Sequence, residues 1–412
     1  MKLLVLAATA TLISATESTS TLRSDFIAWK TKHSKTYTDN IFEQRYQIYQ
    51  KNDKFINKHN NALPASTFTV AHNQFSDLTN KEYRTTILGH KSSSRPTPNQ
   101  IAATPQNNNT PPVSWDWRTQ GVVTPVKDQG SCGSCWSFSA VASIEGAFNL
   151  KSNGTTPSQC GKTVCTDGTG AATDCCTFSE QELVDCVNKG KDNCQTGGLP
   201  SDGMTEISNQ MNGFMNTEAQ YPYTSGGGSS SGKCKNKTNA VNIGLTGFNQ
   251  ITSGDEKAML TFAYTQPILS IGIDASQDSF QFYSSGVYID DNCKNGPDDL
   301  DHGVAIVGYG NYQGPPGPAP SPFPDCVANA DQETCDAAPK CNWCADGWFC
   351  SNTACNGAAS IDNAMTANAT IPYWIVRNSW GSEYGMNGYI LMAKDRNNQC
   401  GVATNAIFAT MK

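Results

Sequence analysis

The 412-residue sequence predicts an α+β fold made of a mainly helical half followed by a mainly β half. The helical half is indicated by a long apolar run, Trp136 to Leu150, directly after two closely spaced cysteines. The β half is indicated by short runs rich in Val, Ile and Tyr in the last third of the chain. A Gly/Ser-rich segment, Thr224 to Gly232, separates the two patterns. The length allows a large core.

The chain begins with the features of a secretory signal peptide, expected over residues 1–15. Met1-Lys2 precedes an apolar run that ends in small residues. That run is too short to cross a bilayer, and no later segment is long and apolar enough, so no membrane span is expected. The expected location is the secretory pathway, ending in a lysosome or food vacuole or outside the cell. Four Asn-x-Ser/Thr acceptors fit this route: Asn108, Asn153, Asn236 and Asn368.

Residues 16–88 are predicted to be a helical N-terminal domain. Five residues recur at steps of three or four and would share one helix face: Arg45, Tyr49, Asn52, Ile56 and Asn60. Ala71 to Asp77 alternates as a strand does, and Asp77 could cap a short helix over 80–86. Residues 89–110 are rich in Ser, Pro, Asn and Thr without periodicity, which predicts a flexible linker that a protease can cut.

Residues 111–412 form the main body. Its central helix is expected from about Ser134 to Lys151 and is apolar almost all round, so it should be buried. Ser179 can cap a second helix that ends at Cys186. Between these helices, residues 153–177 contain four cysteines and many small polar residues, which predicts a surface loop held by its own disulfides: Cys160, Cys165, Cys175 and Cys176.

Strands are expected at five places: 268–274, 287–289, 302–308, 373–377 and 388–392. Residues 311–371 interrupt this series with a Pro/Gly run and then six cysteines: Cys326, Cys335, Cys341, Cys344, Cys350 and Cys355. This density predicts a small inserted module held by disulfides. Zinc binding by the last four cysteines is the alternative, and disulfides are favoured in a secreted chain.

The charge is unevenly distributed along the chain. Residues 16–110 contain 12 Lys/Arg and 7 Asp/Glu, a net +5, whereas the rest of the chain after residue 110 has a net charge of −13. An acidic body without a basic stripe makes nucleic acid an unexpected partner. The two parts could attract each other, and acid would weaken that attraction by neutralising carboxylates.

Cys135 is the expected nucleophile. A thiol attacks a carbonyl carbon only as the thiolate, and a helix N-terminus favours the anion. Such a thiol also needs a base, and His302 is the only histidine after residue 110. A redox pair of Cys132 with Cys135 is the alternative, but no thioredoxin-like βαβ pattern surrounds it and it would leave His302 unexplained.

An antiparallel arrangement of the strands at 302–308 and 373–377 would place His302 and Asn378 at the same end. Asn378 could then orient the imidazole, and Trp380 could shield their hydrogen bond from water. The insertion would leave from the opposite end, about 20 Å away at ~3.3 Å per residue. The Gln129 amide could join the Cys135 N–H in an oxyanion hole.

Three segments resemble the papain-type cysteine peptidases, closest to cathepsin L: Gln129 to Trp136, Asp301-His302-Gly303 and Arg377 to Gly381. The resemblance covers nearly everything from Thr21 to Lys412 except the two cysteine-rich insertions. It implies a papain-like two-domain fold, with a helical left domain, an antiparallel β-barrel right domain and a helical inhibitory propeptide. It also implies a cysteine endopeptidase that is made as an inactive proenzyme and needs no metal or other cofactor.

The resemblance further implies three disulfides, Cys132–Cys194, Cys186–Cys234 and Cys293–Cys400. The remaining cysteines are four in the first insertion, six in the second, and Cys135. Both insertions therefore hold even numbers, which leaves Cys135 as the unpaired thiol.

The substrates implied are proteins and peptides, and the propeptide is implied as an intramolecular inhibitor. The substrate-binding residues implied are Gly197, Gly198, Leu199, Pro200, Gly272, Leu300, Gly303 and Asn405. The pocket for the second residue before the cut is mostly apolar, which predicts a preference for a bulky apolar residue there. The alternative function is a binding or adhesion protein that uses its cysteine-rich insertion on a peptidase scaffold. The partner of that insertion stays open.

Overall fold

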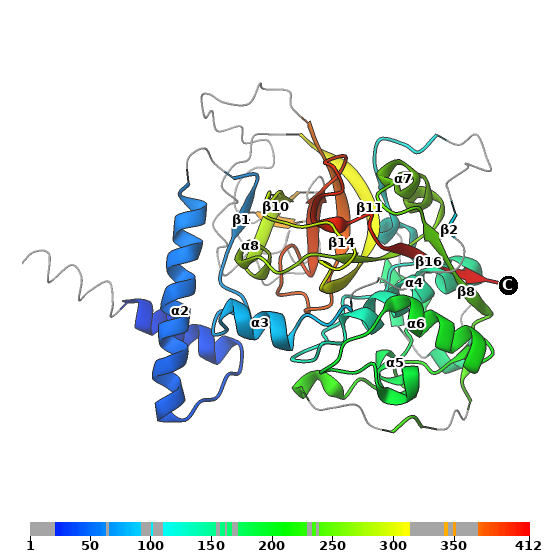
Figure 1. Ribbon diagram of the computed structural model, residues 1–412, viewed down its shortest axis with the longest axis horizontal. Helices are drawn as coiled ribbons and strands as arrows, with labels where there is room; N and C mark the ends of the chain where they lie inside the picture. The colour runs from blue at the N-terminus through cyan, green and yellow to red at the C-terminus, as the bar shows by residue number, and fades with distance from the viewer. Residues whose placement is uncertain are drawn as a thin grey trace, which may run out of the picture.

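The computed structural model describes residues 21–62, 66–91, 100–101, 110–153, 157–160, 163–166, 172–228, 233–235, 239–313, 342–344, 349–351 and 370–412. The expected signal peptide, most of the linker and most of the second insertion lie outside these residues. Within them the chain has the predicted α+β fold, with helices in its first half and a large sheet in its second half (Figure 1). None of its described helices is long and apolar enough to cross a membrane.

The N-terminal domain forms a separate lobe at the left of Figure 1. It contains a helix over residues 21–32, α2 (Asp39–Asn60), β1 (Phe68–Val70) and α3 (Asn80–Thr86). One face of α2 contacts the segment that follows it, as the three-to-four residue spacing predicts. Asn52 Nδ2 donates to the Ser76 and Leu78 carbonyls at 3.0 Å, and Asn60 Nδ2 donates to the Val70 carbonyl at 2.8 Å.

Two local predictions in this lobe are wrong. The strand ends at Val70, and turns follow at residues 74–77. The cap of α3 is Thr79, whose side chain accepts from the Glu82 N–H while the Glu82 carboxylate accepts from the Thr79 N–H. This reciprocal pair satisfies two unpaired donors at once, whereas Asp77 could satisfy one. The Asp77 carboxylate instead accepts from the Tyr37 hydroxyl at 2.6 Å.

The helical half is built around α4 (Cys135–Ser152), which is buried along nearly its whole length. Around it lie α5 (Glu180–Cys186), α6 (Pro200–Thr205), a π-helical turn at Glu206–Gln210 and the ladder of β6 (Phe214–Met215) with β7 (Val241–Asn242). Short 3₁₀ turns occupy Trp117–Gln120, Ser158–Cys160, Val187–Gly190, Ser225–Gly227 and Gln399–Gly401. Ser179 caps α5 as predicted, accepting from the Glu182 N–H at 3.0 Å.

Five disulfides lie in the described part of the chain. Cys132–Cys194, Cys186–Cys234 and Cys293–Cys400 are the pairs that the resemblance implies. The first insertion contains a hairpin of β4 (Thr163–Thr166) and β5 (Ala172–Cys175). Cys165–Cys175 joins its two strands, and Cys160–Cys176 closes its base. The side chains of the cysteines in the second insertion lie outside the described part of the structure, so their pairing stays a prediction.

The second half forms a ten-stranded sheet in which the strands of the N-terminal lobe and linker take part. Its order is β1, β10, β15, β14, β11, β9, β16, β8, β2, with β3 also paired to β11. The strands not yet given are β2 (Gln100–Ile101), β3 (Trp115–Asp116), β8 (Leu245–Ile251), β9 (Leu269–Ile273), β10 (Tyr283–Tyr288), β11 (His302–Gln313), β14 (Thr370–Arg377), β15 (Tyr389–Ala393) and β16 (Ala406–Met411). Helices α7 (Glu256–Thr265) and α8 (Asp278–Gln281) connect them.

Strands β11 and β14 pair antiparallel, so His302 and Asn378 lie at one end of the hairpin as predicted. The pairing continues to Gln313 opposite Thr370 at the other end, where the insertion joins. Within the insertion the described residues form one ladder, β12 (Asn342–Cys344) with β13 (Phe349–Ser351). The insertion therefore enters the fold more than ten residues of strand away from the start of β11.

Replacing residues 314–369 by a two-residue Asn-Gly turn should leave the peptide hydrolysis that the sequence predicts unchanged within the error of the assay. Gln313 and Thr370 are already paired across the ladder, so a tight turn can join them without moving β11 or β14. The measurement is kcat/KM for a short fluorogenic peptide after acid activation. A folded deletion variant that no longer cleaves the peptide would contradict this separation.

Candidate active site

Cys135 stands at the N-terminus of α4, fully buried and not in a disulfide. The Gly303 N–H donates to its sulfur, with 3.3 Å between the nitrogen and Sγ. Gly303 suits this position because a Cβ there would come within 3.1 Å of the Trp136 Cα and 3.2 Å of the Cys135 carbonyl oxygen. The glycine thus allows β11 to approach the helix N-terminus closely.

The His302 backbone lies close to this thiol, since His302 directly precedes Gly303. Its Nε2 is 2.8 Å from Asn378 Oδ1, the neighbour that the hairpin predicts. Trp380 stacks on the imidazole, with 4.6 Å between ring centroids and 24° between ring planes. His302 Nδ1 is buried and has no hydrogen-bond partner among the described residues. The second ring nitrogen is therefore available for a proton exchanged with a neighbouring group.

Gln129 is also fully buried, and its amide orientation is fixed by Ser379, whose hydroxyl donates to Oε1 at 2.6 Å. The opposite end, Nε2, donates to two carbonyl oxygens at 2.7 Å. One is Cys132 of the same loop, and the other is Ile87 of the N-terminal lobe. A carbonyl oxygen of this chain therefore already occupies the donor that was predicted for an oxyanion.

Residues 87–91 of the N-terminal segment run over the thiol between the two halves. Gly198 N–H donates to the Gly89 carbonyl at 2.9 Å, and Lys91 N–H donates to the Gly198 carbonyl at 3.0 Å. On the β side, His90 N–H donates to the Asp301 carbonyl at 3.0 Å. Gly197 lies so near that a Cβ on it would be 2.0 Å from the Gly89 carbonyl oxygen. These contacts leave no room for another peptide.

This covering keeps both reactive groups uncharged. Burial raises the pKa of the Cys135 thiol to about 11, although the N–H groups of Gly303, Gly89 and Trp136 favour the thiolate. Burial also lowers the pKa of His302 to about 3, against the opposing effect of its hydrogen bond to Asn378. A thiol with a raised pKa next to an imidazole with a lowered pKa is a neutral pair over the physiological range. In this form both residues are in place, but neither the thiolate nor the imidazolium is present.

The residues implied for substrate binding lie along the path of this segment. Gly272 is on β9, and a Cβ there would be 3.1 Å from Leu300 Cδ1 and 2.8 Å from His90 Nε2. Leu199 is the residue before α6, and Pro200 is the first residue of that helix. Asn405 is buried beside β9, and its carbonyl accepts from the Gly272 N–H at 3.2 Å. The sequence reasoning missed His90, which ends the lobe and gave no periodic signal.

Aromatic contacts anchor the lobe against the site. Phe75 and Tyr83 both meet the Trp380 ring edge to face, at centroid distances of 5.1 and 5.7 Å. The Tyr83 hydroxyl donates to the Ala275 carbonyl at 3.0 Å, and Gln74 Nε2 donates to the Trp380 carbonyl at 2.6 Å. The tryptophan that covers His302 on one side is thus itself covered by the lobe.

Tyr83→Phe should weaken the docking of the lobe by about 1–3 kcal/mol, because it leaves the buried Ala275 carbonyl without its donor. The measurement is the fraction of intact precursor that a thiol-trapping epoxide labels near neutral pH, which should rise. Tyr309→Phe is the matched control, since that buried hydroxyl has no partner among the described residues. Equal labelling of both variants would contradict the role of Tyr83.

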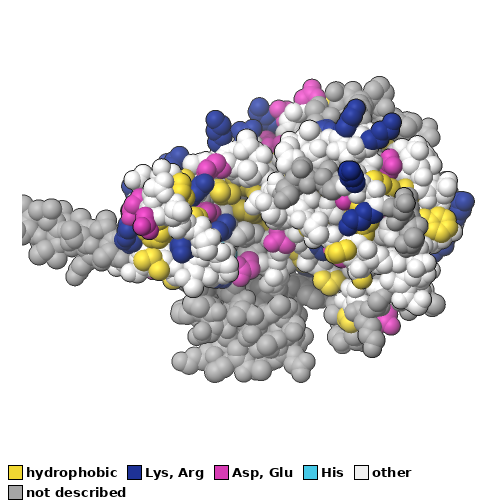
Figure 2. Space-filling view, turned by 90° about the horizontal axis from the view of Figure 1, so that it is seen from below, with side chains coloured by type: hydrophobic (Ala, Val, Ile, Leu, Met, Phe, Trp, Pro, Cys, Tyr) yellow, Lys and Arg dark blue, Asp and Glu magenta, His cyan; other side chains and the backbone are white. Residues whose placement is uncertain are grey.

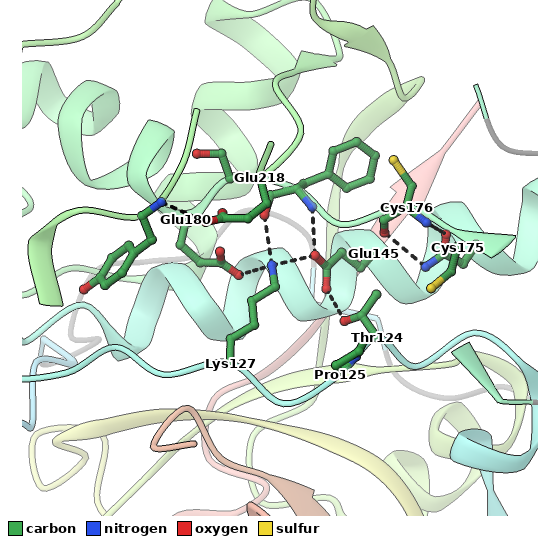
Figure 3. A network of polar contacts seen from close by, with 12 residues as sticks. Thr124, Pro125, Lys127, Glu145, Cys175, Cys176, Glu180 and Glu218 are labelled. Atoms are coloured by element: carbon green, nitrogen blue, oxygen red, sulfur yellow. Dashed lines mark hydrogen bonds and ion pairs between the residues drawn. The ribbon is translucent and has the colours of Figure 1, made fainter. Parts of the chain in front are cut away.

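A buried charge network lies behind the site, between α4 and α5 (Figure 3). Lys127 Nζ donates to Glu145 Oε1 at 2.8 Å, to Glu180 Oε1 at 2.7 Å and to the Phe178 carbonyl at 2.9 Å. Glu145 Oε2 also accepts from the Thr124 hydroxyl at 2.6 Å. Burial raises the pKa of Glu180 to about 8, and Lys127 only partly opposes this. The sequence reasoning missed this network because no motif links these residues.

The surface shows a different distribution of charge. On the face in Figure 2, Lys/Arg and Asp/Glu side chains lie interspersed among uncharged ones. Ion pairs that join the lobe to the body are few in the described part. They are Lys91 with Asp192, and Lys32 and His33 with Glu383. The contact between lobe and body therefore rests mainly on buried aromatic rings and backbone hydrogen bonds.

Comparison with known proteins identifies two family matches. The family described as papain family cysteine protease matches residues 111–410, and the cathepsin propeptide inhibitor domain matches residues 26–83. Cysteine proteinase 2 of Dictyostelium discoideum is 35% identical over 390 residues, which cover 94% of this chain and 91% of that protein. Procathepsin L of Rattus norvegicus is 34% identical over 399 residues, covering 94% and 92%.

Solved structures agree with this result. The structure of digestive procathepsin L2 proteinase from Tenebrio molitor larval midgut aligns with a TM-score of 0.69 at 27% identity, covering 95% of this chain and 100% of that one. The recombinant stem bromelain precursor aligns with a TM-score of 0.66 at 25% identity, covering 95% and 99%.

Proposed function

Since this chain belongs to the papain family of cysteine proteases and contains the propeptide inhibitor domain, we propose a mechanism in which one Cys–His pair cleaves peptide bonds after the propeptide leaves. The protein is a cathepsin L-like cysteine proteinase made as a zymogen. Nothing found favours a protein whose main role is binding or adhesion. The residues that carry out the reaction and the stretch removed on activation are the proposal.

In this proposal Cys135 is the nucleophile and His302 is the base. Removal of the propeptide segment lets water reach both groups, which relieves the burial that keeps them neutral. The thiol proton passes to the imidazole, and the N–H groups at the α4 N-terminus favour the thiolate that results. Asn378 holds the ring through its 2.8 Å contact with Nε2, and Trp380 keeps water from that contact.

The thiolate then attacks the carbonyl carbon of the scissile peptide, and the carbonyl oxygen becomes an oxyanion. Gln129 Nε2 is the proposed donor to that oxyanion together with the Cys135 N–H. The Ile87 carbonyl, which Nε2 now binds at 2.7 Å, supports this assignment because it shows that a carbonyl oxygen fits there. His302 gives its proton to the leaving amine, and the tetrahedral adduct collapses to the thioester as the peptide carbon–nitrogen bond breaks.

A water molecule completes the cycle. His302 takes a proton from the water, and the resulting hydroxide attacks the thioester carbonyl carbon. The carbon–sulfur bond breaks, the acid product leaves, and Cys135 returns to its thiolate with the imidazolium beside it. The remaining proposed subsites are backbone contacts at Gly197 and Gly198, and a pocket of Leu199, Pro200, Gly272, Leu300, Gly303 and Asn405.

Activation is proposed to remove residues 16–110 by a cut near 104–112, after the signal peptide 1–15 has been cleaved. The peptidase domain would then be residues 111–412, with the inserted module at 311–371. The signal peptide and disulfides support a secretory route, and an acidic lysosome or food vacuole or the extracellular space is the proposed destination.

The observation that carries this proposal is the propeptide backbone lying over an unpaired cysteine, with its carbonyl on the predicted oxyanion donor. The test is labelling of the full precursor by an epoxide that alkylates activated thiols, before and after acid treatment. We expect weak labelling before, strong labelling of Cys135 after, and loss of the lobe from the labelled species. An unlabelled protein in both states would overturn the proposal.

A further inference from the structure

The propeptide inserts one side chain, His90, into the proposed substrate pocket. Only 7% of this residue is exposed. Its ring lies against Gly272, where a Cβ would come within 2.8 Å of Nε2 and 2.9 Å of Cε1. Leu300 borders the same space, 3.1 Å from that Cβ position. The imidazole therefore fills the volume that a substrate side chain would use.

The backbone on both sides of His90 is held firmly. Its N–H donates to the Asp301 carbonyl, while Gly89 and Lys91 exchange hydrogen bonds with Gly198 across the cleft. The Lys91 ammonium also pairs with the Asp192 carboxylate. These contacts fix the backbone on both sides of His90, so the segment cannot lift out of the cleft without breaking the backbone pairing.

Neither ring nitrogen of His90 has a hydrogen-bond partner among the described residues. An uncharged imidazole tolerates such a site, but an imidazolium has two N–H donors and a charge that need compensation. Burial accordingly lowers the pKa of His90 to about 4, and the backbone groups of Leu300 and Lys91 oppose this only in part. The pocket thus holds the ring in its neutral form.

No described charged group offers that compensation. Burial raises the pKa of the Asp301 carboxyl to about 7, so this group is itself largely neutral in acid, and it accepts from the Ala275 N–H at 2.9 Å. The Asp192 carboxylate is paired with Lys91. His302 is the titratable neighbour on β11, and a positive charge on His90 would oppose its protonation. Cys135 is neutral in this form. A second positive charge next to His302 would therefore have no described counter-ion in the cleft.

We propose that the pocket between Gly272 and Leu300 accepts a neutral imidazole but rejects a protonated one, so that His90 retains the propeptide near neutral pH and acid expels it. This proposal rests on the proposed function, since it takes that pocket as the substrate site. Docking depends on pH because His90 binds protons less tightly in the docked state than in the released one. Docking is strongest above the usual histidine pKa of 6.5 and weakens by up to about tenfold per pH unit below it.

The first experiment uses the full precursor and short exposure to the thiol-trapping epoxide at pH 3.5 to 7.5, at about half-unit steps. The signal is the label on the band that still has precursor size. In wild type we expect labelling to rise as pH falls below about 6.5. His90→Phe keeps a ring of similar size but cannot be protonated. In this variant the rise in labelling should shift to lower pH, and its slope should correspond to about one proton fewer than in wild type.

His59→Gln is the matched control, because His59 also lies on the lobe but its Nε2 is 3.2 Å from the Phe68 carbonyl oxygen of the same lobe. Its profile should stay close to wild type. A His90→Phe profile that coincides with wild type would overturn the proposal, as would a shift of equal size in His59→Gln.

The second experiment uses the mature wild-type enzyme and keeps the proposal testable if His90→Phe does not fold. Peptides that carry His or Phe at the second position before the cut are compared by kcat/KM at each pH. The ratio of His to Phe should fall by up to about tenfold per pH unit below 6.5, and titration of the catalytic pair cancels in the ratio. A ratio independent of pH would overturn the inference. Failure to cleave either peptide at any pH would instead overturn the proposed function.

Discussion

Cys135→Ser should reduce peptide hydrolysis by about 10⁴-fold or more, because a hydroxyl beside a His–Asn pair is a far weaker nucleophile than a thiolate. The fold should persist, since Cys135 is in no disulfide and serine fits the same buried volume. The measurement is kcat/KM on a fluorogenic peptide at acid pH, with the far-UV spectrum as the check on folding. The precursor should also stop processing itself.

Processing in trans provides the control for this variant. A small amount of wild-type mature enzyme should cut the linker of the Cys135→Ser precursor and release a body of the mature size. That body should remain inactive, which would separate loss of chemistry from loss of folding. A processed variant that cleaves the peptide at the wild-type rate would show that Cys135 is not the nucleophile.

Lys127→Met should lower the free energy of unfolding by about 3–5 kcal/mol, the range for removing one partner of a buried ion pair. Lys127 is the shared donor to the buried Glu145 and Glu180 (Figure 3). Its loss leaves Glu180 without a cation and leaves Glu145 only the more distant Arg377 guanidinium, 3.8 Å from its Oε2. The measurement is the denaturant midpoint of the Cys135→Ser precursor, which cannot digest itself. Lys294→Met is the control, because Lys294 pairs with Asp299 at the exposed surface. Equal midpoints in the two variants would contradict the prediction.

The same network predicts a pH dependence. The folded pKa of Glu180 is raised to about 8 from its usual 4.5, so between these values the folded state binds more protons than the unfolded state. Stability from this group is therefore present at acid pH and lost as pH rises towards 8. Glu180→Gln cannot titrate but can still accept from Lys127, so its stability should fall less over this range. Denaturant midpoints at pH 5 and pH 8 give the comparison.

The placement of the proposed catalytic residues could be predicted because it depends on residue counts and on the ends of two neighbouring strands. One histidine follows the linker, the strand ends place His302 with Asn378, and the even cysteine counts leave Cys135 over. The contact face of α2 could also be predicted, since helical spacing alone places Asn52 and Asn60 on the same face of the helix.

What the sequence did not reveal depends on contacts between distant segments. His90 fills its pocket because Gly272, 182 residues later, leaves room for a ring. No sequence pattern around either residue predicts that the two are in contact. Lys127, Glu145 and Glu180 come from three elements in the same way. The error at Asp77 has a local cause: two residues later, Thr79 forms a reciprocal cap with Glu82, which outcompetes a single acceptor.

The segments that activation would remove supply the outermost strand at both edges of the sheet. β1 pairs with β10 at one edge, and β2 pairs with β8 at the other. Unpaired strand edges are templates for association with other chains. We therefore expect the precursor, with both sheet edges covered, to stay free of self-association at high concentration. The mature enzyme would expose β8 and β10 together, so a body expressed without its first 110 residues should aggregate during folding more readily than the precursor does.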